Sequence, residues 1–330
     1  MTFQPKIELH LHLEGAAPPD LIRQIGKEKG TDLSGIFRPD GSYDTGDFTR
    51  FLQVYEAASS VLQAPEDYRR LARAVVEGLA ARGVIYAEVF TAPQIAARND
   101  VALWREMVAA VAEGAAAVPG FALRQIATCV RHFGPEDARA AAACAVATAG
   151  EGVTGWGMGG DERMHAPADF APTFEAAREA GLGITVHAGE FAGPESVRAA
   201  LDALRPTRIG HGVRAAEEPS LVARLAEEGV VLEVCPGSNV ALGLYEDVAS
   251  HPIDALRRAG VLVTVSTDDP PFFHTDMDAE YRALAASFGW GEPDFKEINR
   301  TAVHAAFCDD ATRARLLAAL ETRDGPPDDR

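Results

Sequence analysis

The sequence predicts a (β/α)8 barrel (TIM barrel), the α/β fold in which eight parallel strands are ringed by helices. Eight short β-rich runs alternate with segments of helical period along the chain. Four of these runs follow a glycine that can end the preceding helix, in "AARGVIYAEV", "EAGLGITV", "AEEGVVLEV" and "RRAGVLVTV". Eight such units favour closure into a barrel over an open sheet.

The first run, "KIELHLH", alternates apolar and polar residues with the period of a strand. Helices are expected between the runs, for example over 66–82 and over 219–228, where a proline stands near the first turn. The eight expected strands are 6–12, 84–91, 122–130, 153–158, 183–188, 207–212, 230–235 and 261–267.

The interval between the first two strands is the longest, and it leaves room for extra helices. One of these is expected over 47–62, "DFTRFLQVYEAASSVL". Helices inserted there would lie over the barrel mouth as an active-site lid. No shift in composition and no Gly/Ser linker marks a second domain, so residues 1–330 are expected to form one domain. The tail over 323–330, "RDGPPDDR", is expected to be disordered.

The net charge of the chain disfavours several classes of partner. The chain has 31 basic and 49 acidic residues, a net charge of −18. This field repels nucleic acid and anionic membranes and favours a small neutral or cationic ligand, although the acidity can equally serve solubility alone. No apolar run approaches the roughly 18 residues of a membrane helix, and the N-terminus has no signal segment, so the protein is expected in the cytoplasm. The four cysteines form no Cys-x-x-Cys pair and are expected to be reduced, mostly buried thiols.

Polar residues that do not suit a buried strand stand at the carboxyl ends of four predicted strands, where barrel enzymes carry their catalytic groups. His10 and His12 are two apart on one strand, so both rings face the same side. Zinc binds imidazole nitrogen and carboxylate oxygen, and a catalytic site leaves a position for water, whose pKa falls from about 15.7 to about 7. His187 and one aspartate would complete such a ligand set. The residues at these strand ends are His10, His12, His187, Glu190, His211, Asp268 and Asp269.

Each of these residues has an ordinary explanation when it is taken alone. A lone buried histidine is usually a hydrogen-bonded core residue, the aspartate pair can form a turn or a helix N-cap, and Glu190 can be an ordinary loop acid. Their common placement at strand ends is what favours a metal site. The remaining histidines lack that placement and are expected to be structural: His132, His165, His251, His274 and His304.

Six motifs of this chain resemble those of the adenosine and adenine deaminases of the amidohydrolase superfamily. They have the family's order and approximate spacing, from the first predicted strand to the predicted tail: "ELHLHLEG", "GMGGDE", "VHAGE", "RIGHG", "VCPGSN" and "STDDP". The resemblance implies a barrel with one zinc ion per chain and hydrolytic removal of the 6-amino group of a purine.

The resemblance also implies a role for each matching residue. The zinc ligands would be His10, His12, His187 and Asp268. Glu190 would be the general acid that protonates N1 of the purine, with a pKa raised by partial burial. His211 would hold the zinc-bound hydroxide, and Asp269 would orient it and contact N7. The substrate contacts would be His12, Glu14, Gly160 and Asp269, with the backbone of Gly160 close to N3.

Two absences separate this chain from related zinc enzymes. A lysine that could bridge two metals on the fourth strand is missing, because no lysine occurs between Lys29 and Lys296, so one metal is expected. The His-x-Glu and Pro-Cys-x-x-Cys pattern of the cytidine deaminases is missing as well.

Two departures from the family bear on the substrate. Glu14 stands where many adenosine deaminases have an aspartate that contacts ribose, and glutamate there is common in adenine deaminases. Gly157 stands where the family often has an aspartate. The segment with Phe48, Phe51 and Leu52 resembles the helical lid over a nucleoside, which favours adenosine or deoxyadenosine as the substrate and inosine and ammonia as products.

Other functions stay open on the sequence alone. The alternatives are deamination of adenine to hypoxanthine, deamination of another amino-heterocycle such as a pterin, and a non-catalytic purine sensor. A sensor would not need the general acid Glu190. The expected partner is a small purine nucleoside or base, and no protein partner follows from the sequence.

Overall fold

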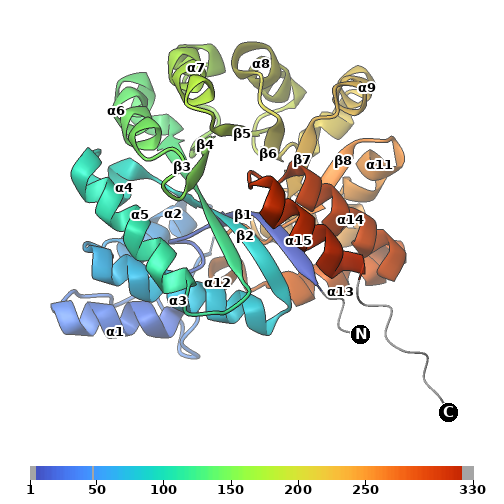
Figure 1. The fold of residues 1–330 in the computed structure, drawn as a ribbon. Coiled ribbons are helices and arrows are strands. Elements are labelled where there is room, and N and C mark those ends of the chain that lie inside the picture. The colour runs from blue at the N-terminus through green and yellow to red at the C-terminus, as the bar shows by residue number, and fades with distance from the viewer. Residues whose placement is uncertain (1–4, 47, 322–330) are drawn as a thin grey trace.

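Eight parallel strands form a barrel whose last strand meets its first. The computed structural model describes residues 5–46 and 48–321, and within them the strands hydrogen-bond in their order along the chain (Figure 1). A single parallel bridge joins β1 (Lys6–His12) to the segment after β8 (Leu262–Val265). Here His12 N donates to Asp268 O at 3.0 Å, and Asp268 N donates to His10 O at 3.2 Å. Three of the expected zinc ligands therefore lie on the seam that closes the barrel.

The predicted barrel is confirmed, and four of the strands begin and end at the predicted residues. β6, β7 and β8 are shorter than predicted, and β4 is one residue longer. β6 ends at His211, whose φ of 60° turns the chain out of the sheet. The remaining strands are β2 (Val84–Thr91), β3 (Ala122–Val130), β4 (Val153–Gly159), β5 (Gly183–Ala188), β6 (Arg208–His211) and β7 (Val231–Val234).

Helices ring the barrel and connect consecutive strands (Figure 1). The helix expected over 219–228 is confirmed at both ends, and the helix expected over 66–82 lies one residue earlier. Short 3-10 helices are η1 (Arg131–Phe133), η2 (Pro167–Phe170), η3 (Val213–Glu217) and η4 (Val248–Ser250). The α-helices are α1 (Pro19–Lys29), α2 (Phe48–Ser59), α3 (Pro65–Ala81), α4 (Pro93–Ala97), α5 (Val101–Ala115), α6 (Gly134–Ala147), α7 (Ala171–Glu179), α8 (Pro194–Leu204), α9 (Pro219–Glu228), α10 (Pro236–Ala241), α11 (Ile253–Arg258), α12 (Pro270–Phe273), α13 (Met277–Phe288), α14 (Glu292–Ala305) and α15 (Asp310–Glu321).

The connection between α14 and α15, the helices in front of the strands in Figure 1, lies at the amino-terminal end of the barrel. Its Phe307 side chain packs against β4 and β5, where a Cβ at Gly155 or Gly183 would come within 2.8 or 2.2 Å of the ring. The guanidinium carbon of Arg208 lies 3.6 Å from the centroid of the same ring. Two strand glycines thus make room for one aromatic side chain.

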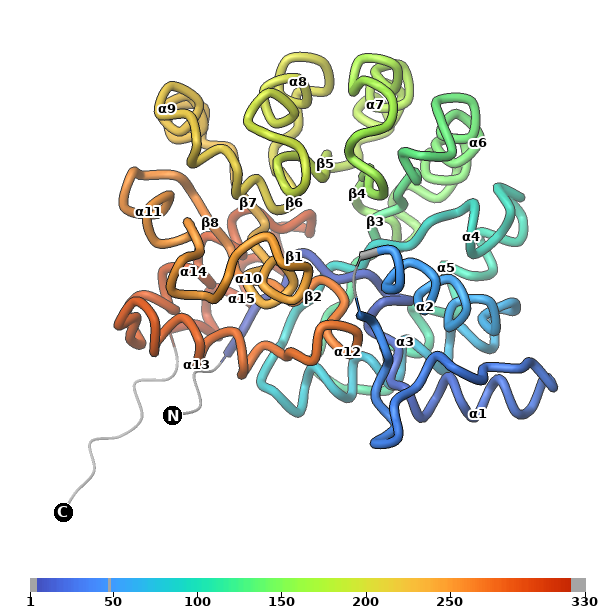
Figure 2. Tube along the Cα trace, turned by 180° about the vertical axis from the view of Figure 1, so that it is seen from behind, coloured from blue at the N-terminus to red at the C-terminus, as the bar shows by residue number. Residues whose placement is uncertain are grey.

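The helix from the long first interval, α2, lies at the opposite, carboxyl-terminal end. Figure 2, seen from behind, brings α10 and α12 in front of the strands. The Phe51 ring of α2 lies 5.0 Å from the Phe273 ring of α12, which begins directly after Asp269. Leu52 is an exposed residue of α2. The function of α2 as a lid stays a prediction, and the side chain of Phe48 lies outside the described residues.

Three further expectations concern the chain as a whole. The tail over 323–330 lies outside the described residues, and the single domain over 1–330 stays a prediction. In the described part of the chain, no helix has the length and apolar character needed to cross a bilayer. The four cysteines are free thiols, and three of them are buried while Cys308 is partly exposed.

Candidate active site

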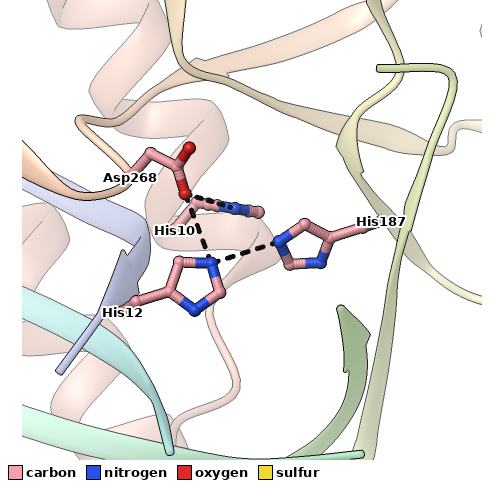
Figure 3. A group of neighbouring side chains, drawn as sticks. All are labelled: His10, His12, His187 and Asp268. Carbon is pink, nitrogen blue, oxygen red and sulfur yellow. Dashed lines mark hydrogen bonds and ion pairs between the residues drawn. The ribbon is translucent and has the colours of Figure 1, made fainter. Parts of the chain in front are cut away.

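Four side chains from three parts of the barrel converge at its carboxyl end. His10 and His12 come from β1, His187 comes from β5, and Asp268 comes from the turn after β8. Figure 3 shows the three rings and the carboxylate directed toward one another. Asp268 Oδ1 lies 3.2 Å from His12 Nε2 and 3.5 Å from His10 Nε2. His12 Nε2 lies 3.3 Å from His187 Nε2, so the four form a group that can hold a metal ion.

The donor set fits a zinc-like ion. A tetrahedral ion with bonds of about 2.0–2.1 Å separates its ligand atoms by about 3.3–3.4 Å, close to the distances in this group. His10 Nε2 is buried without a hydrogen-bond partner in the described residues. An unpaired buried nitrogen is costly, and a metal ion would satisfy it. Three imidazole nitrogens and one carboxylate oxygen also match the ligands that zinc prefers.

Each ligand has a further contact that orients it. His10 Nδ1 lies 2.8 Å from Glu233 Oε2 on β7, and His187 Nδ1 lies 2.9 Å from a backbone carbonyl of β4. Ser238 Oγ donates to Asp268 Oδ2 at 2.6 Å. Because carboxylate and carbonyl oxygens only accept, both histidines carry a proton on Nδ1, and Nε2 is the atom that would bind a metal ion.

Glu233 belongs to a buried network of ion pairs inside the barrel. Arg208 on β6 contacts Glu233 through Nε at 2.5 Å and Glu88 on β2 through Nη2 at 2.6 Å. Thr185 Oγ1 donates to Glu233 Oε1 at 3.0 Å. Burial opposes ionisation of Glu233, but Arg208 and His10 outweigh burial and lower the pKa of Glu233. The ionised Glu233 keeps the His10 proton on Nδ1.

Glu190 and His211 lie beside the four-residue group. Glu190 Oε2 lies 3.7 Å from His211 Nε2. Burial raises the pKa of Glu190 well above its usual range, and the negative charges of Asp268 and Glu162 add to this effect. Burial lowers the pKa of His211 to about 3, so its ring is neutral. A buried carboxyl that keeps its proton can deliver that proton to a substrate nitrogen.

Asn239 connects Glu190 and His211 to a histidine farther from the metal group. Ile253 N donates to His251 Nδ1 at 3.2 Å, so His251 carries its proton on Nε2 and donates it to Asn239 Oδ1 at 3.2 Å. This turns the Asn239 amide nitrogen toward Glu190 Oε1 and His211 Nδ1, each at 3.4 Å. Since an amide nitrogen only donates, His211 Nδ1 accepts and its Nε2 carries the proton. His251, expected to be structural, therefore supports the site.

Asp269 has a carboxylate oxygen that is available to a ligand. Its Oδ1 is buried and has no hydrogen-bond partner among the residues that the structure describes. The same atom lies 1.6 Å from the position of a Cβ at Gly15, so only glycine leaves room for it. Burial raises the pKa of Asp269 well above its usual range, and the charges of Asp268, Glu190 and Glu14 add to this.

Glu14 is buried, accepts a hydrogen bond from one tyrosine and acts through its charge on a second. It is 3% exposed, and Tyr68 of α3 donates its hydroxyl to Glu14 Oε1 at 2.8 Å. Burial raises the pKa of Glu14 to about 7, although the hydrogen bond from Tyr68 acts in the opposite direction. Burial raises the pKa of Tyr55 on α2, and the charges of Glu14 and Asp269 raise it further. Both α2 and α3 therefore contribute to the surroundings of Glu14.

The glycines singled out near β4 have different surroundings. Gly160 is exposed with φ of 96°, and a Cβ there would come within 2.8 Å of His132 Nδ1. The backbone and His132 thus explain this glycine, and its contact with a substrate stays a prediction. A Cβ at Gly157 would lie 3.2 Å from Thr128 Oγ1 and 3.3 Å from Phe90 Cε1. An aspartate at that position would require these neighbours to move.

Several residues that hold the site were not predicted from the sequence. Glu162 and Asn239 lie inside the motifs "GMGGDE" and "VCPGSN", so their motifs were recognised while their contacts were not. Glu233 is an acid in the apolar run "VVLEVC", and a buried acid of this kind needs a charged or hydrogen-bonding partner. No feature of the sequence marks Tyr68.

Known proteins resemble this chain along almost all of its length. The sequence model of the adenosine deaminase family, described as "Adenosine deaminase", matches residues 5–323. A protein named adenine deaminase from Chelativorans sp. (strain BNC1) is 50% identical over 319 residues, which cover 96% of this chain and 98% of that protein. A protein with the same name from Agrobacterium fabrum is 49% identical over 318 residues, which cover 96% and 97%.

Solved structures show the same similarity. An adenine deaminase from Arthrobacter aurescens has a TM-score of 0.87 and 31% sequence identity, and the match covers 96% of this chain and 98% of that one. An amidohydrolase from Burkholderia ambifaria, with bound zinc, has a TM-score of 0.85 and 28% identity, with 97% and 90% covered.

Proposed function

The chain belongs to the adenosine deaminase family, and on that premise we propose that it is a zinc-dependent adenine deaminase, which converts adenine and water to hypoxanthine and ammonia. The sequence alone favours adenosine as the substrate, with adenine as the alternative. The relatives that are 50% and 49% identical carry the name adenine deaminase, so the alternative is the better supported of the two.

One observation carries the proposal: a metal-binding group lies together with a proton-bearing carboxyl and an unpartnered carboxylate oxygen. Hydrolysis at C6 needs a nucleophile derived from water, a proton for the ring nitrogen and groups that orient the ring. This end of the barrel offers a candidate for each of these needs.

The zinc ion would be held by His10, His12, His187 and Asp268. When bound, zinc supplies Lewis-acid chemistry that makes water a nucleophile near neutral pH. Glu233 and Ser238 would keep two of these ligands in their binding orientation.

The remaining residues would bind the purine and move protons. Glu190 would give its proton to N1, which draws electrons from C6 and prepares that carbon for attack. His211 would donate its Nε2 hydrogen to the oxygen that arrives at C6. Asp269, whose Oδ1 is free of hydrogen bonds in the described residues, would orient the attacking water and contact N7. His12 and Gly160 would flank the ring.

Glu14 would distinguish the free base from the nucleoside. Its side chain is one methylene longer than the aspartate that contacts ribose in many adenosine deaminases, and Tyr68 holds it in place. Free adenine has an N9–H group, whereas adenosine has ribose on N9. We expect Glu14 to bind near this edge of the base, with ribose excluded by the same side chain.

The experiment is an assay of amine release by zinc-loaded protein, with adenine, adenosine, deoxyadenosine, N6-methyladenine and an aminopterin as substrates. The amine is ammonia for each of them except N6-methyladenine, which would release methylamine. Adenine should give hypoxanthine and ammonia, and in H2¹⁸O the hypoxanthine should gain one ¹⁸O atom. A zinc-loaded preparation that releases no ammonia from any 6-aminopurine would contradict the proposal. Saturable purine binding without turnover would support a sensor instead.

A further inference from the structure

Glu162, in the loop after β4, would neither bind the purine nor transfer a proton in the reaction outlined above, yet it binds the loop that carries Glu190. Its carboxylate accepts four consecutive backbone N–H groups. Gly189 donates to Oε1, while Glu190, Phe191 and Ala192 donate to Oε2 at 3.1, 2.9 and 2.9 Å. The residue is 4% exposed, and within the described residues no salt bridge involves it. We refer to these four amides and the Glu162 carboxylate as the cradle.

The local backbone explains why a carboxylate is needed there. Gly189 has φ of 71°, and a Cβ at this position would come within 2.4 Å of Val197 Cγ2. A left-handed residue followed by an ordinary turn brings successive N–H groups together and forms a concave site for an anion. Without an acceptor, these partly buried donors would remain unsatisfied. Glu162 therefore supplies the anion that this turn requires.

We propose that Glu162 is a positioning residue that aims the Glu190 carboxyl at the substrate. The inference rests on the proposed function, because it assumes that Glu190 delivers a proton to the purine ring. The Glu190 side chain has only longer contacts, 3.4 Å to Asn239 and 3.7 Å to His211. The cradle at 2.9–3.1 Å is the tighter restraint on this residue, and it acts on its backbone.

The cradle also explains how the barrel fixes the orientation of a loop residue. Glu162 follows β4 and the four amides follow β5, and these strands are neighbours in the sheet. The cradle therefore joins two adjacent loops just beyond their strands. A misplacement of about 1 Å in a reacting group can lower a rate by about 10²-fold.

The test is Glu162→Gln, which keeps the size of the side chain but replaces one accepting oxygen with an amide nitrogen. At least one backbone N–H group then faces a donor. We expect kcat for adenine to fall by about 10- to 100-fold, with KM changed by less than about 3-fold and with the zinc content unchanged. The matched control is Glu195→Gln. The Glu195 carboxylate accepts a hydrogen bond from Gly193 N at 3.0 Å, directly after the cradle, but it binds none of the four cradle amides. Its replacement should change kcat by less than about 2-fold.

A double-mutant cycle separates positioning from general support of the fold. If Glu162 acts through Glu190, Glu162→Gln should lower kcat by less than about 2-fold in protein that already carries Glu190→Gln. Equal losses in both backgrounds, or a parallel loss of zinc, would overturn the proposal. Wild-type protein that is inactive on adenine would refute the proposed function but would leave the cradle untouched. Hydrogen exchange of the backbone amides of residues 189–192 tests the cradle in that case as well. Exchange should be faster in Glu162→Gln, and unchanged exchange would overturn the cradle.

Discussion

Replacement of Glu233 by glutamine tests how the barrel interior prepares a metal ligand. The carboxylate accepts hydrogen bonds from His10, Arg208 and Thr185. Glutamine offers one accepting oxygen and one donating nitrogen. If the glutamine oxygen keeps the hydrogen bonds from Arg208 and Thr185, the glutamine nitrogen faces His10 Nδ1. His10 must then carry its proton on Nε2, the atom that would bind zinc.

The magnitude follows from these contacts. Loss of an outer contact of this kind lowers metal affinity by about 10- to 100-fold, or about 1.4–2.7 kcal/mol. In either orientation of the glutamine, Arg208 loses one of its two carboxylate partners while it stays buried. Breaking a buried ion pair costs about 3–5 kcal/mol of folding free energy. Glu233→Gln should therefore weaken zinc binding and destabilise the apoprotein.

Glu88→Gln is the matched control. It removes the other carboxylate partner of Arg208, and Glu88 has no contact with His10. Zinc affinity is measured by competition with a chromophoric chelator, and the free energy of unfolding by urea titration of the metal-free protein. Glu88→Gln should destabilise the protein to a similar extent while its zinc affinity stays within about 3-fold of wild type. If both variants keep wild-type zinc affinity, or both lose it equally, the reasoning about His10 is refuted.

Three further predictions concern single carboxyl groups. Glu190→Gln should retain zinc but lose at least about 10²-fold in kcat for adenine. Metal analysis of the same preparation checks this, and a loss of zinc in parallel with the loss of activity would contradict the role of Glu190 as proton donor. Glu14→Asp should raise the ratio of kcat/KM for adenosine to that for adenine, and an unchanged ratio would remove Glu14 from substrate selection. Burial raises the pKa of Glu280 from 4.5 to about 7, against the hydrogen bonds from Thr275 and Gly237. Between pH 4.5 and about 7 the folded protein thus keeps a proton on Glu280 that the unfolded chain releases. The contribution of this group to the free energy of unfolding is therefore full below pH 4.5, and it falls by about 3 kcal/mol as the pH rises through 7. Urea titrations from pH 5 to 8 should show wild type losing stability relative to Glu280→Gln, and a constant difference would contradict the assignment.

The strands were predictable because their signals are local. β2 and β5 follow glycines that end a preceding helix, and both begin and end at the predicted residues. β7 and β8 were predicted to be longer at both ends, because the apolar residues Val230, Cys235 and Val261 and the β-branched Thr267 continue the strand pattern of the sequence beyond the strands themselves. Apolar character does not report where the backbone leaves the sheet.

The site was predictable in its ligands but not in the contacts that hold them. Period-two alternation places His10 and His12 on one face, and the barrel topology brings His187 and Asp268 to the same end. Tyr68, by contrast, is separated from Glu14 by 54 positions, and their contact depends on how α3 packs against the barrel. Glu8 likewise points inward for a reason that only the structure supplies. It accepts hydrogen bonds from Thr267 N and Oγ1 at 2.9 and 2.5 Å, directly before Asp268.

The central claim is that this barrel deaminates free adenine. Its most direct test is a side-by-side measurement of kcat/KM for adenine and adenosine on one zinc-loaded preparation. Adenine should be preferred by at least about 10²-fold, a lower bound set beneath the about 10⁴- to 10⁵-fold by which a polar site rejects a substrate that cannot complete its hydrogen bonds. A preference for adenosine, or turnover of neither purine, would contradict it.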